Sequence, residues 1–189
     1  MIKREMLLFE QGGPENTEAT LEASCRRAKE LGIKRVVLAT STGRTALKAL
    51  DAFKGLDVQI IGVTLHAGFW KVYVAPDKDM VAAAEARGAR FLTATHSLMG
   101  NVESAIREKL GGAQPVELIA HTYYTFCQGM KVAVEVAVMA ADAGLVENGE
   151  EVIAVGGTNE GADTAVVLKA AYTTHFFDVK VREVIAMPR

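Results

Sequence analysis

The chain has 189 residues, of which 50% are hydrophobic and 23% are charged, which suits one globular domain over residues 1–189. Twenty-one basic and 23 acidic side chains leave a net charge of -2, and without a basic stripe nucleic acid is not expected as a partner. The opening MIKREMLLFEQGG has only four consecutive apolar residues, too few for a secretory leader or a membrane span. We therefore expect a cytoplasmic protein with no membrane partner.

Helix and strand patterns alternate along the first two thirds of the chain. The expected elements are a helix over residues 16–31, a strand from residue 34, a helix over 46–53, a strand over 57–65, a helix from 76 to 88, a strand over 90–94 and a helix over 101–110. Asn16 and Thr17 either join a binding site or only begin the first helix.

The segment MKVAVEVAVMAADAG, residues 130–144, is apolar nearly all round and ends at a glycine, as helices do. Such a helix must be covered on more than one side. Either it is sandwiched inside the fold or it packs on a second copy of the chain, and we expect a contact in a homodimer or larger homo-oligomer. A strand over 150–155, a helix over 163–171 and an edge strand over 179–187 complete an α/β pattern with helices on both faces of a sheet.

The segment RVVLATSTGRTA runs from a buried-type strand into a helix. The turn between them gathers four hydroxyls, a glycine and an arginine, namely Thr40, Ser41, Thr42, Gly43, Arg44 and Thr45. A helix N-terminus has unpaired N–H groups and the positive end of the helix dipole, so it favours an anion. Arg44 can add a charged, forked donor. Any one of these residues is equally typical of a cap or a tight turn, but together they favour a phosphate site.

A second loop, GGTNEGADT, follows the strand over 150–155. Its candidate ligand contacts are Gly156, Gly157, Thr158, Asn159 and Asp163, although a glycine-rich turn with Asp163 as a helix N-cap explains it equally well. Ligands of open α/β sheets bind beyond the carboxyl ends of the strands. The two loops would face one crevice if their strands were neighbours, which the residues alone do not establish.

Further candidates follow the strands over 57–65 and 90–94. Thr64 lies at the carboxyl end of the first, and Trp70 could stack on a flat ligand ring, although a lone tryptophan more often belongs to a core or a subunit interface. His66 and His96 lie near the same edge, but no histidine has the spacing of a zinc ligand. No catalytic motif is found, so no catalytic or metal-binding residue is assigned.

The STGRTA turn, with its flanking strand and helix, resembles the carboxy-terminal domain of pyruvate kinase, where the equivalent loop can hold the phosphate of a sugar-phosphate activator. Over FEQGGPENTEATLEAS, ATSTGRTALKAL and VGGTNEGADTAVVLKAA, the chain is similar to a small family of stand-alone prokaryotic proteins with that fold. The resemblance implies a three-layer α/β/α domain. It also implies a mixed five-stranded sheet of order 3-2-1-4-5 with strand 5 antiparallel, which would make the first and fourth strands neighbours.

The resemblance also bears on function. It implies flavin mononucleotide (FMN) as a cofactor in the crevice, and no pyruvate kinase activity, because the catalytic barrel of those enzymes has no counterpart here. Ser41 stands where those enzymes often have a lysine, and a helix is predicted where they have a final strand, so a sugar bisphosphate is not expected. Two functions remain open: an FMN-binding protein that supports flavin redox chemistry, and a non-enzymatic module that senses a phosphorylated metabolite.

Overall fold

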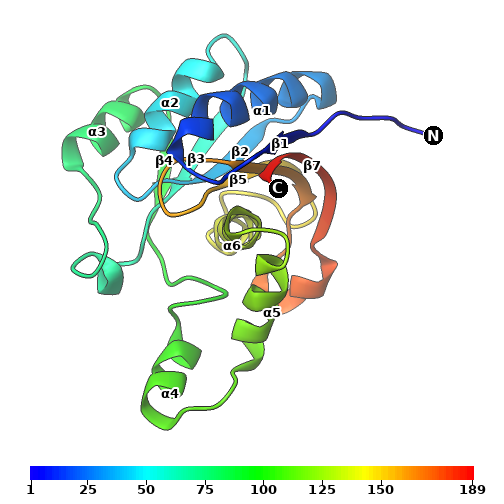
Figure 1. The fold of residues 1–189 in the computed structure, drawn as a ribbon. Coiled ribbons are helices and arrows are strands. Elements are labelled where there is room, and N and C mark those ends of the chain that lie inside the picture. Colours follow the sequence, from blue (N-terminus) through cyan, green and yellow to red (C-terminus); the bar gives the residue numbers. More distant parts are fainter.

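A seven-stranded sheet runs through the middle of the computed structural model, which describes residues 1–189 (Figure 1). Its strands are β1 (Leu7–Phe9), β2 (Arg35–Ala39), β3 (Gln59–Val63), β4 (Arg90–Leu92), β5 (Glu151–Gly156), β6 (Thr164–Lys169) and β7 (Lys180–Pro188). The α-helices are α1 (Thr17–Leu31), α2 (Arg44–Ala52), α3 (Lys78–Ala86), α4 (Val102–Leu110), α5 (Pro115–Tyr124) and α6 (Gln128–Asp142). Short 3-10 helices are η1 (Pro14–Asn16), η2 (Ala67–Phe69) and η3 (Thr173–Asp178).

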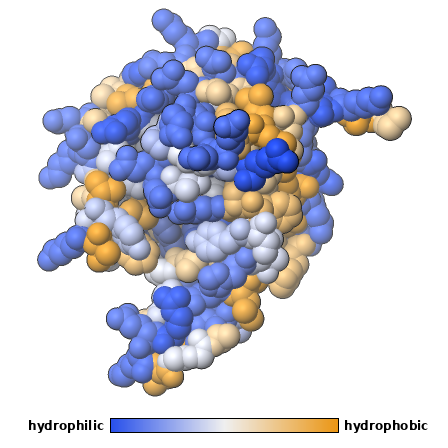
Figure 2. All heavy atoms as spheres, viewed as in Figure 1, coloured by the Kyte–Doolittle hydropathy of each residue, from blue (hydrophilic) through white to orange (hydrophobic).

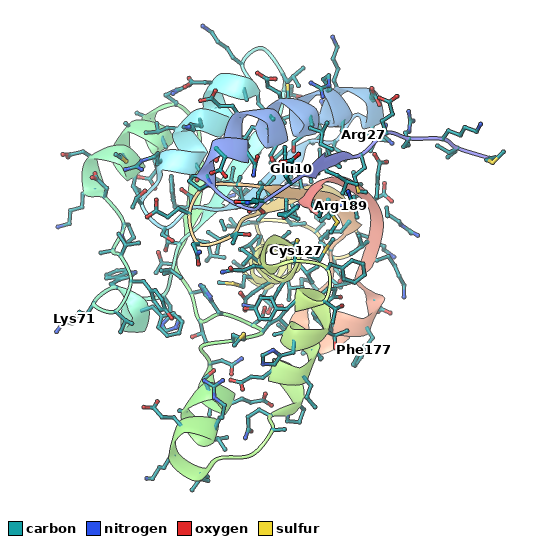
Figure 3. The ribbon with its side chains drawn as sticks, viewed as in Figure 1. Glu10, Arg27, Lys71, Cys127, Phe177 and Arg189 are labelled. Carbon is teal, nitrogen blue, oxygen red and sulfur yellow. The ribbon has the colours of Figure 1, made fainter.

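The helices lie on both faces of the sheet, as expected. Helices α1, α2 and α3 cover one face, and α6 covers the other with α5 packed beyond it (Figure 1). Side chains alternate along β2, because Val36 and Leu38 enter the core under α1 and α2 whereas Val37 enters the core against α6. Arg27 of α1, labelled in Figure 3, donates to both carboxylate oxygens of Glu183 on β7 at 2.8 and 2.7 Å. The helices and the sheet therefore form three layers, with one hydrophobic core on each face of the sheet.

The strand order is β1-β7-β6-β5-β2-β3-β4. Strands β2, β3, β4 and β5 are mutually parallel, β6 is antiparallel to both β5 and β7, and β1 is parallel to β7. The expected adjacency of the strands before the two candidate loops is confirmed, since Leu38 of β2 is in register with Val155 of β5. This pairing brings both loops to one edge of the sheet.

The expected count of five strands is wrong, because the structure has seven. The segment predicted as a helix over 163–171 contains β6, which takes the antiparallel place beside β5. The strand predicted at an edge is β7, which lies between β6 and β1. β6 is buried on both faces, so its sequence TAVVLK is a short apolar run without the alternation that separates strand from helix. Strand β1 is only three residues long, too short for a recognisable pattern.

Helix α6 is sandwiched within its own chain. It packs on β2, β3, β5 and β6 on one side and on α5 and η3 on the other, and Val134 and Val138 are completely buried. The expectation that this helix forms a contact between subunits is therefore wrong, because α5 and η3, which the sequence did not reveal, cover its outer side. None of the helices combines the length and apolar character needed to cross a membrane.

Helices α4 and α5 form an arm that extends from the body of the molecule (Figure 1). The buried Glu117 joins them, because its carboxylate accepts hydrogen bonds from Ser104 Oγ at 2.9 Å and Arg107 Nη1 at 3.1 Å. The space-filling view shows apolar residues at the tip of this arm (Figure 2), where Leu110 is exposed. Polar contacts therefore hold the two helices together, and apolar side chains face outward.

A close backbone contact fixes α6 against β5. A Cβ atom at Gly156 would lie 2.3 Å from the main-chain oxygen of Gly129 and 2.9 Å from the amide nitrogen of Ala133. We expect Gly156→Ala to lower the free energy of unfolding by about 2 to 3 kcal/mol, because the helix must move away from the sheet. The measurement is urea denaturation, and the control is Gly88→Ala. A Cβ atom at Gly88 has no neighbour within 4 Å, so this variant costs only the backbone strain of its φ of +95°, about 1 kcal/mol. Equal costs for the two variants would contradict the contact.

Candidate functional site

The turn between β2 and α2 has main-chain amides without an acceptor. The amide of Gly43 donates to Thr40 Oγ1 at 3.1 Å, and that of Arg44 donates weakly to Thr42 Oγ1 at 3.4 Å. The amides that make no hydrogen bond within the protein are those of Ser41, Thr42, Thr45 and Ala46. Unpaired N–H groups at the start of a helix, together with the helix dipole, form a favourable environment for an anion.

The side chains of this turn differ in their availability. Thr40 is buried and its hydroxyl caps Gly43, so it has a structural role. Ser41 and Thr42 are half-buried, and the Thr42 hydroxyl accepts the amide of Arg44. Arg44 is exposed and makes no ion pair with any carboxylate of the protein. Its guanidinium therefore remains free for a ligand.

Gly43 is required by the conformation of the turn. Its φ of +99° is in the left-handed region, and a Cβ atom there would lie 3.3 Å from Met80 Cβ and from the amide nitrogen of Val81. The start of α3 also supports the turn, because the amide of Asp77 donates to the carbonyl of Thr42 at 3.2 Å. Replacing Gly43 would therefore disturb the conformation of the turn itself, and not only the binding of a ligand.

Asp163 holds the second loop together. It is fully buried, and its Oδ2 accepts hydrogen bonds from the amides of Gly13 at 3.0 Å and Thr158 at 2.9 Å. Its Oδ1 accepts the hydroxyl of Thr164 at 2.7 Å. The expectation that Asp163 caps a helix is wrong, since β6 follows it. Because both carboxylate oxygens have partners, the side chain organises the loop and is not free for a ligand.

The remaining residues of this loop lie at the same sheet edge. Gly156 is buried against α6, Gly157 is half-buried, and Asn159 is exposed at the tip with a φ of 61°. The amides of Gly157 and Asn159 make no hydrogen bond within the protein. The loop can thus present main-chain donors beside the turn at residues 40–45.

The N-terminal segment closes against the second loop. Thr17 is buried, donates to the carbonyl of Pro14 at 2.6 Å and accepts the amide of Ala162 at 3.0 Å. The Asn16 side chain donates to the carbonyl of Gln11 at 2.8 Å and does not cap α1. Thr17 therefore fastens the N-terminal segment to the second loop, whereas Asn16 stabilises the turn within residues 11–16.

Thr64 and Trp70 already have hydrogen-bond partners. Thr64 is buried at the end of β3, and its hydroxyl lies 2.6 Å from that of Thr93. Trp70 Nε1 donates to the carbonyl of Leu65 at 2.7 Å. The indole is 36% exposed, so part of its surface remains accessible. Trp70 therefore does not belong to the core, and no hydrogen bond links it to residues 40–45.

A buried ionic cluster that the sequence did not reveal lies on α6. Lys131 Nζ donates to Glu135 Oε2 at 2.5 Å, and these two residues are only 4% and 2% exposed. Glu135 Oε1 accepts the amides of Leu98 and Met99 at 2.8 and 3.0 Å, and His96 Nδ1 lies 3.6 Å from Glu135 Oε2. The sequence feature that could have indicated this cluster is the pair of opposite charges, four residues apart, in an otherwise apolar helix.

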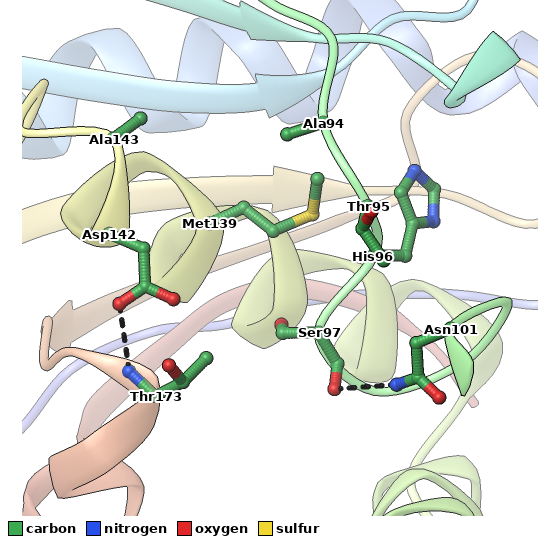
Figure 4. A pocket seen from close by; sticks show the side chains of 9 residues that line it. All are labelled: Ala94, Thr95, His96, Ser97, Asn101, Met139, Asp142, Ala143 and Thr173. Carbon is green, nitrogen blue, oxygen red and sulfur yellow. Dashed lines mark hydrogen bonds between the residues drawn. The ribbon is translucent and has the colours of Figure 1, made fainter. Parts of the chain in front are cut away.

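A cavity of about 340 Å³ lies beside α6, away from both loops. Its lining residues are Ala94, Thr95, His96, Ser97, Asn101, Met139, Asp142, Ala143 and Thr173 (Figure 4). Asp142 accepts the amide of Thr173 at 2.9 Å, and the Asn101 side chain donates to the carbonyl of Ser97 at 3.1 Å. Its volume is at the low end of ligand pockets, and of the candidate residues raised from the sequence only His96 lines it.

The pKa of His96 lies below the ordinary histidine value, chiefly because burial disfavours the charged ring. Lys131 and His66 lower it further, while Glu135 and the carbonyl of Thr64 oppose the shift. As the pH falls, the histidine is therefore protonated in the unfolded chain before it is protonated in the folded protein. The free energy of unfolding consequently decreases from about pH 6.5, the ordinary histidine value, down to the lowered pKa of the folded state.

In urea denaturation, we expect His96→Gln to lose less stability than the wild type on acidification through this window. The exposed His175 provides the control His175→Gln, which should follow the wild type. Identical pH profiles for His96→Gln and the wild type would contradict the assignment.

Comparison with known proteins identifies the family. A family model described as "Pyruvate kinase, alpha/beta domain" matches residues 18–168. Two solved structures of pyruvate kinase from Cryptosporidium parvum are 17% and 16% identical to this chain, with TM-scores of 0.42 and 0.39. A third, in complex with ADP, is 18% identical with a TM-score of 0.42. These matches cover 81% of this chain but only 22% to 23% of each kinase. By the match over residues 18–168, the chain belongs to the pyruvate kinase alpha/beta domain family.

Proposed function

We propose that this protein binds a phosphorylated small molecule, with FMN as the leading candidate, beyond the carboxyl ends of β2 and β5. The observation that carries the proposal is the set of main-chain amides without acceptors, which belong to Ser41, Thr42, Thr45 and Ala46. A phosphate provides the acceptor oxygens that these donors lack, and it matches the positive end of the α2 dipole.

The charged side chain of the turn adds to these donors. The Arg44 guanidinium is exposed and unpaired, and it can reach a phosphate through two parallel N–H groups. Ser41 is half-buried and makes no side-chain hydrogen bond within the protein, so its hydroxyl can donate as well. The second loop faces the same edge because β2 and β5 are paired, and its free amides can contact the part of the ligand next to the phosphate.

Energetics indicate that the ligand has more than a phosphate. Charge-assisted hydrogen bonds contribute about 1.5 to 3 kcal/mol each, so three of them give roughly 5 to 9 kcal/mol. Association costs at least about 4 kcal/mol, and micromolar affinity needs about 8 kcal/mol net. A flat apolar ring can supply the difference by burial. FMN has such a ring and a single phosphate.

A flavin oxidoreductase is the enzyme that this proposal favours. The flavin ring supplies the redox chemistry when bound, and the protein supplies its position and surroundings. The competing function is a non-enzymatic sensor of a phosphorylated metabolite. One observation favours it. Thr64 and Asp163 at the sheet edge are held in hydrogen bonds within the protein, so neither side chain is available to take part in a reaction. A yellow purified protein would favour the flavoprotein, and a colourless one the sensor.

A cytoplasmic location and a homo-oligomeric state stay predictions.

Removing the charge at Arg44 tests the proposed phosphate site. We expect Arg44→Ala to weaken FMN binding by about 1 to 3 kcal/mol, roughly 5- to 150-fold in Kd, because a charge-assisted hydrogen bond is lost. The measurement is a titration that follows FMN fluorescence. The matched control is Lys54→Ala, which removes one exposed positive charge just beyond the other end of α2 and should leave Kd unchanged. Equal Kd values for Arg44→Ala and the wild type would place the phosphate elsewhere.

A further inference from the structure

Helix α4 turns its apolar side chains toward solvent. Val102, Ile106 and Leu110 are 74%, 41% and 77% exposed, and their spacing of four residues places them in one row along the helix. Ser104 and Arg107, on another side of α4, donate to the buried carboxylate of Glu117 on α5. The side of α4 that contacts the protein is therefore polar and the side that contacts water is apolar, which reverses the usual arrangement of a surface helix.

Helix α4 gains little stability from its own chain. None of its nine residues is buried, and it packs on α5 in the arm that extends from the body of the molecule (Figure 1). A helix this short is marginally stable in water without apolar packing. The hydrogen bonds to Glu117 fix the position of α4, but no apolar side chain of this helix is buried. Covering the exposed row would therefore stabilise the arm.

The charges of α4 indicate which kind of partner fits this row. The helix has two acidic residues, Glu103 and Glu108, and two basic residues, Arg107 and Lys109. It therefore has no excess of positive charge, which an anionic membrane or a nucleic acid would require. Because the two signs balance, two copies of this surface do not repel each other, and a second copy of the chain is a compatible partner.

The spacing of the row suits packing against its own copy. Side chains four residues apart form a ridge inclined to the helix axis, and two such ridges interlock when the helices cross at about −50°, the commonest helix packing in globular proteins. In a contact with two-fold symmetry, residues near the axis meet their own counterparts. Ile106 is at the middle of the row, so it lies at that axis, with Val102 and Leu110 on either side.

The arm provides a contact of limited size. Residues 102–126 include 16 exposed residues, whereas a standard interface has about 20 to 30 residues on each side. The arm therefore corresponds to the small end of specific interfaces, where association is weak and reversible. We expect a dimer that dissociates in the micromolar range.

We propose that the outer face of α4, formed by Val102, Ile106 and Leu110, binds the same face of a second copy and so forms a two-fold dimer through the arms. The homo-oligomer expected from the apolar pattern of α6 is thus made by a different helix, because α6 is covered within its own chain. The inference is independent of the proposed phosphate site, since the arm contains none of the residues of that site.

Sedimentation velocity of the intact protein between about 1 and 300 µM measures this association. We expect the mass to rise from that of one chain, 20.2 kDa, toward twice that value. In Ile106→Glu the dimer Kd should rise at least about 30-fold, because two acidic side chains meet at the axis. The matched control is Val72→Glu, since Val72 is 71% exposed and lies outside the arm; this variant should associate like the wild type.

A wild-type protein that keeps the mass of one chain at about 300 µM would overturn the proposal. Equal dimer Kd values for Ile106→Glu and the wild type would also overturn it, because the contact would then lie on another surface. Circular dichroism checks that each variant is folded. If Ile106→Glu is not, Ile106→Ala decides, since it only shortens an exposed side chain: a rise of about tenfold in Kd supports the contact, and an unchanged Kd contradicts it.

Discussion

The parallel pairing of β2 with β5 is the constraint on which the proposed site depends. It brings a turn from the first half of the chain and a glycine-rich loop from the second half to one edge of the sheet. Asp163 and Thr17 then fasten that loop to the N-terminal segment through buried hydrogen bonds. Because these polar side chains are committed to holding the loops, the free donors at the edge are main-chain amides together with the side chains of the turn at residues 40–45, chiefly Arg44. This arrangement favours an anion without depending on a buried charge.

The two faces of the sheet divide the edge into regions of different chemistry. On the side of α2 there are unpaired amides and the exposed Arg44, which suit a charged oxygen group. On the side of α6 there are rings, a neutralised ion pair and the unsatisfied nitrogen of His66. The proposed phosphate site therefore lies on the α2 side of the sheet, where the positive end of the helix dipole favours an anion.

The sequence predicted much of the fold but less of the site. The first helix, the strand over residues 35–39 and the turn at residues 40–45 follow from local patterns, and the structure places α1, β2 and this turn there. Strand β6 was mistaken for a helix because a short run buried on both faces has no periodicity. The contacts of Asp163 with Gly13 and of Glu135 with Leu98 could not be predicted, since these partners are 150 and 37 positions away and are brought close only by tertiary packing.

The most direct measurement is the response of backbone amides to FMN in a ¹⁵N–¹H correlation spectrum of the intact protein. The account predicts that the amide signals of Ser41, Thr42, Thr45 and Ala46 shift together as FMN is added, because each gains an acceptor. Signals from the far end of α2 should stay in place. Saturable FMN binding that leaves these four amides unchanged would contradict the central claim that this turn holds the phosphate.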